Sequence, residues 1–312
     1  MSKLRFLVLG AAAGGGLPQW NCGCPNCMAA RDPVSGMTPQ SQSSLAVSAD
    51  GENWAIFNAS PDIRAQIEKN ACLHPRGLRG SPIRSVIVTN GDIDHVTGLL
   101  TLREKQPFTL FATATLMETL RQNPVFEVLD PALVERKTIG LDTVFSPLPG
   151  MRIRLFPVPG KAPLYLEAEG LRLGQESEDT VGVEFLIGER RAFYIPGCGA
   201  MTPALGARLM GADLVFFDGT VFSDDEMISA GVGHKTGRRM GHMPISGPGG
   251  SLAALSTLSI ARKIYVHINN TNPIWQAGPE RRQVEAAGFE IGQDGMEVSL
   301  ADIHIPADID VA

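Results

Sequence analysis

Short apolar runs recur along the whole chain and restrict its fold more than any other feature of the sequence. Each run spans four to six residues and is bounded by turn residues, as is typical of strands. The runs lie at 4–9, 44–48, 54–58, 85–89, 108–112, 152–157, 183–187, 192–195, 214–218 and 263–268. Segments with helical spacing separate them, at 63–70, 114–122, 202–210, 251–261 and 279–287. This alternation predicts an α/β fold.

Two halves of mixed strand and helix pattern, roughly 1–155 and 156–312, follow each other without a low-complexity linker. Apolar residues make up 44% and charged residues 19% of the 312 residues, which is ordinary usage for a globular chain. We therefore predict a single domain over 1–312, in which two packed mixed β-sheets are flanked by helices. The formal net charge of -6 gives no electrostatic footprint for nucleic acid. Every apolar run is interrupted well before the length of a membrane span, so we expect neither nucleic acid nor a membrane as a partner.

A cysteine cluster near the N-terminus has the spacing C-x-C-x-x-C, with Cys22, Cys24 and Cys27 inside six residues. Three thiolates on a tight loop can hold one tetrahedral zinc ion, so we predict a structural zinc knuckle at about 20–28. The alternatives are three buried thiols, which the polar loop composition disfavours, and a thioredoxin-like redox pair of Cys24 and Cys27. We expect no redox pair because no helix-forming segment follows directly. A cluster of this kind indicates a reducing compartment, and we expect the cytoplasm.

Carboxylates and an imidazole crowd the segment that follows the β-branched run 86–88. Asp92, Asp94 and His95 fall within four residues, and like charges this close repel each other unless a cation neutralises them. Metal binding would relieve that repulsion. The alternative is a turn in which Asp and Asn act as turn formers and helix cap beside an incidental His.

This segment resembles the His-x-His-x-Asp-His signature of the metallo-β-lactamase superfamily, which also follows a strand and opens a helix. Aligned on Asp94 and His95, the first two histidines of that signature fall on Asn90 and Asp92. His267, at the end of the last apolar run, is similar to the superfamily's C-terminal histidine. The resemblance implies an αββα sandwich of the metallo-β-lactamase type.

The resemblance is incomplete in a way that bears on the metal. The superfamily's later histidine region is similar to 158–161 and its bridging aspartate region to 195–198, but here these segments contain neither a His nor a carboxylate. One of two metal positions is thus dismantled. Two histidines and a carboxylate remain, and such a set with open positions suits Fe(II) and oxygen chemistry better than a two-zinc hydrolase. The predicted iron ligands are Asp94, His95 and His267, with Asp92 as an additional ligand or a neighbour of the ligands.

A glycine-punctuated stretch further on carries five basic or titratable groups in nine residues. His242 resembles a superfamily residue that reaches into the active-site cleft, which implies an acid or base role. Lys235, Arg238 and Arg239 then suit the carboxylates of a small acidic substrate. Asp218, at a strand end, either orients a ligand or forms an Asx-turn, and we predict it with His242 as catalytic. The alternative for the whole stretch is a solvated loop.

Four segments together resemble the coenzyme PQQ biosynthesis protein B family, namely GAAAGGGLPQWNCGCPNC, TNGDIDHVTGLL, GHMPISG and HINNTNP. They extend over nearly the whole chain. The resemblance implies a cytoplasmic role in making pyrroloquinoline quinone, by iron- and oxygen-dependent hydroxylation of the tyrosine ring in a Glu–Tyr-derived precursor. Related proteins with the same knuckle have a His where this chain has Asn270, which implies that Asn270 completes the zinc site.

Two other functions stay open at this point. A soluble carrier of the quinone or its precursor would bind the same molecule without chemistry, and a metal-dependent hydrolase of the ancestral type would need the second metal. The ligand set favours the hydroxylase, whose partners are a small acidic tyrosine-derived substrate and dioxygen. Other proteins of the pathway and a second copy of the chain stay open as partners.

Overall fold

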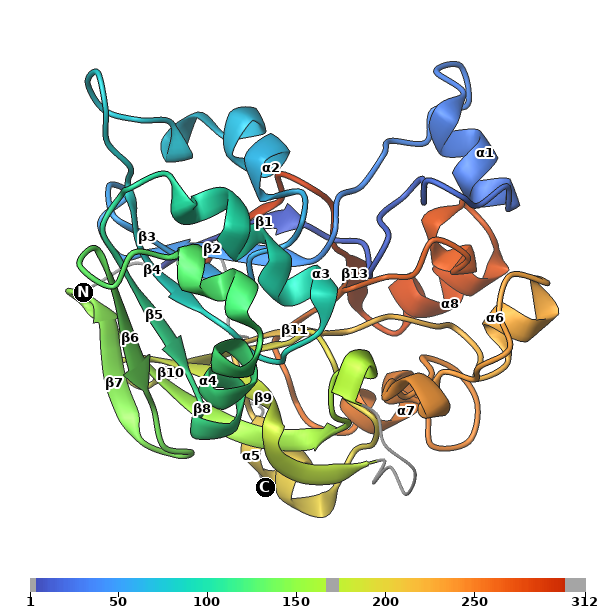
Figure 1. Ribbon diagram of the computed structural model, residues 1–312. Coiled ribbons are helices and arrows are strands. Elements are labelled where there is room, and N and C mark those ends of the chain that lie inside the picture. Colours follow the sequence, from blue (N-terminus) through green and yellow to red (C-terminus); the bar gives the residue numbers. More distant parts are fainter. Residues whose placement is uncertain (1–3, 167–173, 301–312) are drawn as a thin grey trace.

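Seven strands form the first sheet of the computed structural model, which describes residues 4–166 and 174–300 (Figure 1). From one edge to the other they are β14 (Glu297–Ser299), β1 (Arg5–Gly10), β2 (Ser44–Ser48), β3 (Trp54–Phe57), β4 (Ile83–Ile87), β5 (Phe108–Ala112) and β6 (Val134–Thr138). The strands from β14 to β3 pair antiparallel, and those from β3 to β6 pair parallel. The carboxyl ends of β3 to β6 therefore meet at the same edge of the sheet.

Seven more strands form the second sheet. In spatial order they are β13 (Phe289–Ile291), β12 (Arg262–Val266), β11 (Leu214–Asp218), β10 (Arg190–Ile195), β9 (Gln175–Ile187), β8 (Met151–Gly160) and β7 (Val144–Leu148). Here β7 to β10 pair antiparallel, whereas β10 to β13 pair parallel. The parallel half again gathers its carboxyl ends at one edge, where connecting segments can carry a binding site.

The two sheets pack face to face through aromatic side chains. Phe6 of β1 and Phe57 of β3 both contact Phe185 of β9, with ring centroids 5.1 and 5.0 Å apart. All three rings are fully buried, and burial of each such side chain stabilises the fold by about 1.5–3 kcal/mol. Because successive strand residues point to opposite faces, β1 turns Leu7 and Leu9 toward the outer layer instead.

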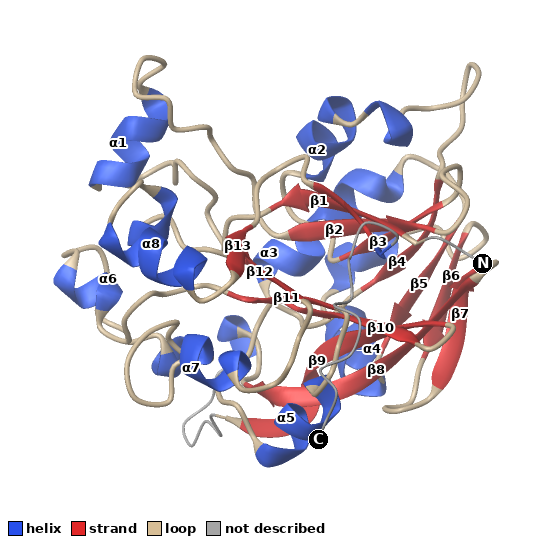
Figure 2. Cartoon of the chain, turned by 180° about the vertical axis from the view of Figure 1, so that it is seen from behind, coloured by secondary structure: helices blue, strands red, loops and turns tan. Residues whose placement is uncertain are grey.

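Helices cover the outer face of each sheet and complete the predicted αββα sandwich (Figure 2). The first sheet carries α2 (Ile63–Lys69), α3 (Ile93–Val96) and α4 (Ala114–Gln122), and the second carries α5 (Pro203–Leu209), α7 (Ser251–Ser256) and α8 (Pro279–Ala286). Thr113 caps α4 and Thr202 caps α5, since each side chain accepts a hydrogen bond from a backbone N–H three residues on. The described residues also form a short α6 (Glu226–Ser229) and six 3-10 helices: η1 (Ala71–Leu73), η2 (Thr97–Arg103), η3 (Pro124–Val128), η4 (Leu164–Leu166), η5 (Arg238–Met240) and η6 (Pro273–Trp275).

The strands that the sequence pattern does not predict are the edge strands. β14 and β6 close the first sheet, and β13 and β7 close the second. Edge strands are short or carry charged side chains, which prevents pairing with other chains and also removes the apolar run on which the prediction depends. The pattern also misses the polar first half of β9, and it extends α7 to residue 261 although the helix ends at Ser256.

A helix begins between the two cysteines of the C-x-x-C pair, contrary to expectation. α1 (Pro25–Arg31) begins directly after Cys24, with Pro25 at its first position, where the missing N–H is not needed. Arg31 in the last turn donates hydrogen bonds of 2.6 Å to the carbonyl oxygens of Cys22 and Gln19, so the helix closes back on the cysteine loop. The prediction that no helix is present here is therefore wrong, and it cannot be used against a redox pair. The cluster has to be assessed from its geometry.

Among the described residues, no helix combines the length and the apolar character that crossing a membrane requires. The single domain predicted over 1–312 includes 1–3, 167–173 and 301–312, which lie outside the described part of the chain.

Candidate metal centre

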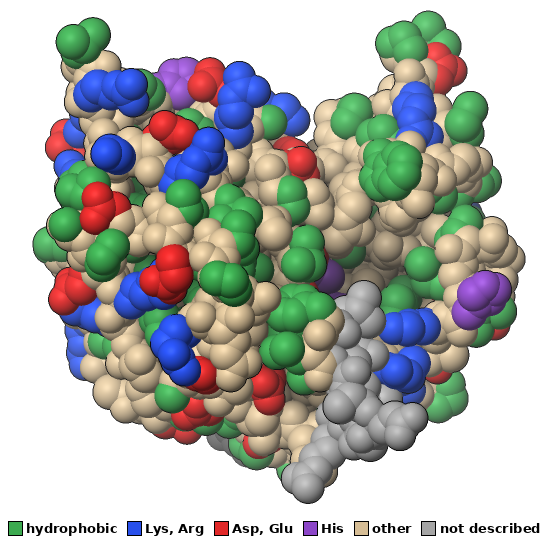
Figure 3. All heavy atoms as spheres, in the orientation of Figure 1, with side chains coloured by type: hydrophobic (Ala, Val, Ile, Leu, Met, Phe, Trp, Pro, Cys, Tyr) green, Lys and Arg blue, Asp and Glu red, His purple; other side chains and the backbone are tan. Residues whose placement is uncertain are grey.

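Segments that follow several neighbouring strands meet at one edge of the sandwich and bring polar side chains together. They line a cavity of about 570 Å³. Figure 3 shows this face hollowed between the part of the chain that carries α2 and the part that carries α1, with histidine colour inside the hollow. The side chains that line the cavity include Asn90, Asp94, Lys161, Thr220, His242 and His267. This is where α/β proteins commonly bind their ligands.

Asp94, His95 and His267 converge at this cavity, with one ligand atom of each within 4.8 Å of the others. Nε2 of His267 lies 3.1 Å from Oδ2 of Asp94, and Nε2 of His95 lies 3.7 Å from the same oxygen. His95 is fully buried, and within the described chain neither of its ring nitrogens has a hydrogen-bond partner. A buried polar atom without a partner costs about 1–3 kcal/mol, which a bound cation would offset. The three residues therefore fit a metal ion.

The protonation states of Asp94 and His95 also suit a metal. Burial raises the pKa of Asp94, but the neighbouring His95 and His267 outweigh it and hold that pKa below its usual range. Burial lowers the pKa of His95 to about 4, in spite of the nearby Asp94 carboxylate. Burial also lowers the pKa of His267, but the carboxylates of Asp94 and Asp218 outweigh it and raise the pKa overall. At neutral pH Asp94 is thus ionised and His95 neutral, as metal ligands must be.

His267 has a backbone φ of 55°, in the left-handed region that non-glycine residues rarely adopt. It follows directly on β12, and the next residue, Ile268, donates from its backbone N–H to the carbonyl oxygen of Ala11 over 2.9 Å. The glycine-rich turn after β1 thereby packs against the metal ligands. A Cβ atom on Gly14 would lie only 3.3 Å from Oδ2 of Asp94, so the turn approaches the carboxylate closely. Backbone strain at such a position is typical of functional residues.

Hydrogen bonds orient His267 from behind. Oγ1 of Thr220 lies 2.8 Å from Nδ1 of His267 and donates to Oδ1 of Asp218 over 2.6 Å, so Nδ1 carries the proton and Nε2 presents its lone pair. Oδ2 of Asp218 lies 2.7 Å from Nδ1 of His242 and accepts from the backbone N–H of Cys198. Burial raises the pKa of Asp218, but the charge and hydrogen bond of His242 outweigh it and lower the pKa overall. One buried carboxylate therefore holds two histidines.

Asp218, His242 and His267 also have the spacing of a metal site, with ligand atoms within 4.8 Å of one another. Their polar atoms are already engaged, because both oxygens of Asp218 accept hydrogen bonds and the Nδ1 atoms of both rings face Asp218 or Thr220. The ring nitrogens of His95 are not engaged in this way. Of the two groups, the one that contains His95 is the better ligand set.

The three cysteines of the knuckle form a separate candidate site, with their sulfur atoms within 4.8 Å of one another. Nδ2 of Asn270 faces all of them, at 3.2 Å from Cys22, 3.5 Å from Cys24 and 3.3 Å from Cys27. Oδ1 of Asn270 is buried and has no hydrogen-bond partner in the described chain. A half turn of the amide exchanges these two atoms and directs the oxygen at the sulfurs. Three sulfurs and one oxygen make the four donors that structural zinc takes.

The ionisation of the cysteines also favours a cation. Burial, with the neighbouring Cys22 and Cys27, raises the pKa of Cys24 to about 11. Burial raises the pKa of Cys22 too, but hydrogen bonds from the backbone N–H of Cys24 and from nearby side chains outweigh it and lower the pKa overall. A thiolate therefore forms more readily at Cys22 than at Cys24. A zinc ion would neutralise the negative charge of both thiolates and so stabilise their ionised forms.

Comparisons with known proteins show the family to which the chain belongs. A family model described as a beta-lactamase superfamily domain matches residues 53–268. The chain is 67% identical over 299 residues to the coenzyme PQQ synthesis protein B of Rhizobium meliloti (strain 1021), across 96% of this chain and 99% of that protein. It is 55% identical to the protein of the same name from Methylobacterium radiotolerans, across 95% of this chain and 100% of that protein. The chain belongs to the coenzyme PQQ synthesis protein B family.

Solved structures extend the comparison to the fold. The crystal structure of Zn²⁺-bound PqqB from Methylobacterium extorquens has a TM-score of 0.92 at 52% identity, and the match covers 94% of this chain and 99% of that one. A diphosphatase of the PhnP family shares the fold alone, with a TM-score of 0.66 at 20% identity over 95% of this chain and 97% of that one. The predicted metallo-β-lactamase fold is confirmed, and the zinc-bound relative supports metal binding in the family.

The second metal position of the superfamily signature holds other groups in this chain. A Cβ atom on Gly197 would lie 3.8 Å from Nδ2 of Asn90 and 3.7 Å from Cε1 of His242, so these residues adjoin one another. Asp92 lines the same cavity, and its Oδ1 atom lies 3.5 Å from Nζ of Lys161. A second divalent ion beside Asp92 would meet the repulsion of this ammonium group. The arrangement favours a site for one metal ion.

The predicted substrate-binding cations do not all reach the cavity. Lys235 lines it. The guanidinium of Arg238 lies 3.5 Å from the carbonyl oxygen of Gly249, and neither Arg238 nor Arg239 is among the residues that line the cavity. The structure thus brings Lys235 to the site and places the two arginines outside its lining, where a role in carboxylate binding stays a prediction.

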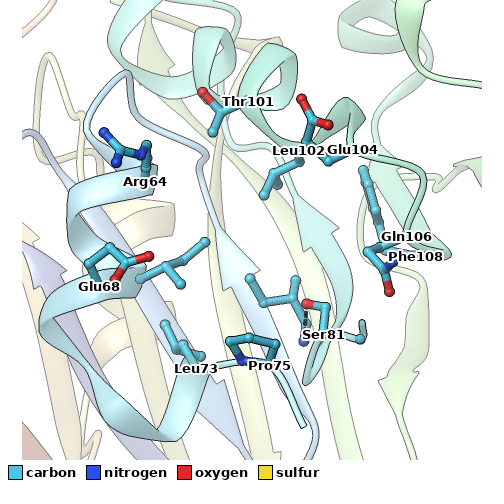
Figure 4. A pocket seen from close by; sticks show the side chains of 13 residues that line it. Arg64, Glu68, Leu73, Pro75, Ser81, Thr101, Leu102, Glu104, Gln106 and Phe108 are labelled. Carbon is cyan, nitrogen blue, oxygen red and sulfur yellow. Dashed lines mark hydrogen bonds between the residues drawn. The ribbon is translucent and has the colours of Figure 1, made fainter. Parts of the chain in front are cut away.

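A smaller cavity of about 220 Å³ lies on the outer face of the first sheet. Figure 4 shows Arg64 and Glu68 of α2 on one side of it and Thr101 and Leu102 of η2 on another. Its lining contains no His or Cys, and none of the predicted site residues contributes to it. The cavity of about 570 Å³, which contains Asp94, His242 and His267, is therefore the candidate functional site within the described residues.

Sequence reasoning missed Thr220 and Lys161. Thr220 stands two residues after β11 and links Asp218 to His267, and Lys161 follows directly on β8. A polar residue one or two positions after a buried strand is the signal that could have found both.

Proposed function

We propose that this protein acts in coenzyme PQQ synthesis as an iron- and oxygen-dependent hydroxylase of the tyrosine ring in a Glu–Tyr-derived precursor. The observation that carries the proposal is the single group of Asp94, His95 and His267, with His95 buried and lacking hydrogen-bond partners in the described chain. Two histidines and one carboxylate with open positions are the ligand set of Fe(II) oxygenases. A hydrolase of this superfamily would use two neighbouring cations, and the ammonium of Lys161 opposes the second.

The residues around the cavity suit a phenol that carries carboxylates. Iron(II) held by the three ligands would supply the activation of dioxygen, which protein side chains do not supply. Because Asp218 holds Nδ1 of His242, Nε2 of that ring is left to take the phenol proton, and the buried carboxylate stabilises the resulting imidazolium. Met227 and Met240 line the cavity with apolar surface for an aromatic ring, and Lys235 adds a positive charge for a carboxylate.

The proposal is tested by comparing iron with zinc. Insertion of one atom of dioxygen into an aromatic C–H bond, with the other leaving as water, takes up two electrons, so the assay contains ascorbate as reductant. Protein reconstituted without oxygen with Fe(II) or Zn(II) is given ascorbate, oxygen and N-succinyl-L-tyrosine, a tyrosine-derived diacid. We expect the iron protein to consume oxygen and to form a product heavier by one oxygen atom, at a rate at least about a hundredfold above that of the zinc protein. Equal rates with the two metals would contradict the proposal.

A His242→Ala variant is expected to hydroxylate the substrate about 10²–10⁴-fold more slowly in kcat, because it lacks the base that accepts the phenol proton. Its KM should change by only a few-fold. The matched control is His234→Ala, which removes an exposed histidine from the lining of the same cavity and should keep kcat near the wild-type value. Steady-state kinetics of both variants provide the measurement, and a His242→Ala protein with wild-type kcat would exclude the acid–base role.

A further inference from the structure

Lys161 places a positive charge beside the metal ligands. It follows directly on β8 and lines the larger cavity. Its side chain is only 11% exposed, with Nζ 3.5 Å from Oδ1 of Asp92, and the ammonium donates a hydrogen bond of 3.2 Å to the carbonyl oxygen of Ala162. The ammonium group is therefore held at a defined point of the cavity wall.

The surrounding backbone holds this position. The hydroxyl of Thr180 donates to the carbonyl oxygen of Lys161 over 3.2 Å. A Cβ atom on Gly241 would lie 3.0 Å from Cγ of Lys161, so the side-chain stem packs closely against a glycine. Tyr165 donates from its hydroxyl to the carbonyl oxygen of Gly91 over 2.8 Å, which ties the segment after Lys161 to the turn before the metal ligands. A lysine with its stem fixed in this way loses little conformational freedom when it binds an anion.

The charges nearby indicate what the ammonium can recognise. Its distance of 3.5 Å to Oδ1 of Asp92 exceeds the roughly 2.7–2.9 Å of a direct charge-assisted hydrogen bond, so a substrate carboxylate could approach the ammonium more closely than Asp92 does. An ammonium group shielded from solvent attracts an anion more strongly than an exposed one does. The place beside Asn90 and Asp92 is also the dismantled metal position, and Lys161 supplies there the positive charge that a second metal ion would otherwise bring.

We infer that Lys161 binds a carboxylate of the substrate and sets the preference of this chain for acidic tyrosine derivatives. The inference rests on the proposed function for its substrate class. A phenol directed at the metal and a carboxylate on Lys161 would fix the ring between two points of the cavity. Lys235, which lines the same cavity, adds a second positive charge for another carboxylate of a diacid.

The test is a binding measurement on the zinc-loaded protein without oxygen, so that no turnover is involved. Titration calorimetry compares N-acetyl-L-tyrosine with N-acetyl-L-tyrosinamide, which differ in the carboxylate. We expect the wild-type protein to bind the acid about tenfold more tightly than the amide. In Lys161→Gln this preference should fall below about twofold while the affinity for the amide is kept, and Lys161→Arg should retain most of it. The matched control is Lys137→Gln, which removes an exposed lysine of β6 and should leave the preference unchanged.

A wild-type preference that persists in Lys161→Gln would overturn the inference, and so would a wild-type protein that binds acid and amide equally. Failure of the proposed function looks different. If the preference depends on Lys161 but the iron protein hydroxylates no tyrosine derivative, the binding role stands and the hydroxylase assignment falls. If hydroxylation proceeds and Lys161→Gln keeps the wild-type KM, the hydroxylase stands and the binding role falls.

Discussion

Replacement of His267 by alanine is expected to remove the active-site metal and the hydroxylation activity together. The ring supplies Nε2 beside Asp94, and Thr220 holds it in that orientation. Loss of a residue that merely supports a metal ligand lowers metal affinity about 10–100-fold, so loss of a ligand should cost at least about a hundredfold. After anaerobic loading with Fe(II) and gel filtration, we expect the iron content to fall from about one ion per chain to less than about a tenth of that.

Two further variants separate metal loss from a folding defect. His267→Asn keeps a residue type that tolerates the left-handed backbone at this position, so it should fold while still binding iron weakly. His74→Ala removes an exposed histidine at the end of η1, which is not among the residues that line the metal cavity, and should retain both iron and activity. A His267→Ala protein that keeps its iron and its turnover would show that the metal lies elsewhere.

Replacement of Cys24 by serine is expected to remove the zinc of the knuckle and to lower the melting temperature by about 10 °C. Zinc binding to a structural site contributes directly to folding free energy, and loss of such a site costs several kcal/mol. Each kcal/mol shifts the melting temperature of a chain of this size by about 2–4 °C. Zinc content by elemental analysis and a thermal melt on the same preparation check the two effects together.

The matched control is Cys72→Ser, which changes a partly buried cysteine outside the cluster and should retain its zinc with a melting temperature within about 2 °C of wild type. Variants of Asn270 provide a second test of the zinc site. If its amide completes the site, Asn270→Ala should weaken zinc binding, whereas Asn270→His, which restores an imidazole donor, should strengthen it. Unchanged zinc content in Cys24→Ser would exclude the cluster as the zinc site.

The interior strands of both sheets could be predicted from the sequence because they are buried on both faces and read as continuous apolar runs. β1 illustrates this, with five consecutive buried residues from Phe6 to Gly10. The edge strand β6 has a single buried residue, Val134, and therefore carries no such signal. The knuckle helix α1 was missed for a different reason, since Pro25 is a helix breaker in the interior of a helix but favours its first position.

The candidate site was predictable where its residues are neighbours in the sequence. Asp94 and His95 follow one strand, and the crowding of charged groups in that segment is enough to predict a metal site. His267 lies 173 residues from Asp94, and only the resemblance to a known signature joined the two before the structure did so at 3.1 Å. Their positions just after buried strands could have marked Thr220 and Lys161 as candidates. The sequence could not show that they lie beside His267 and Asp92, because the strand order decides which strand ends adjoin one another. Arg238 and Lys235 lie in the same basic stretch, so the sequence could not show that only Lys235 of the two lines the cavity.

The segment from His267 to Asn270 touches both candidate metal sites, with only Ile268 and Asn269 between its ends. Its middle is also fastened, since the backbone N–H of Asn269 donates to the carbonyl oxygen of Thr220 over 3.0 Å. Because the segment is held at both ends and in the middle, an inserted or deleted residue would move one end away from its metal site. The length of this segment is therefore fixed, in contrast to the exposed turn at 75–79, where insertions can be accommodated.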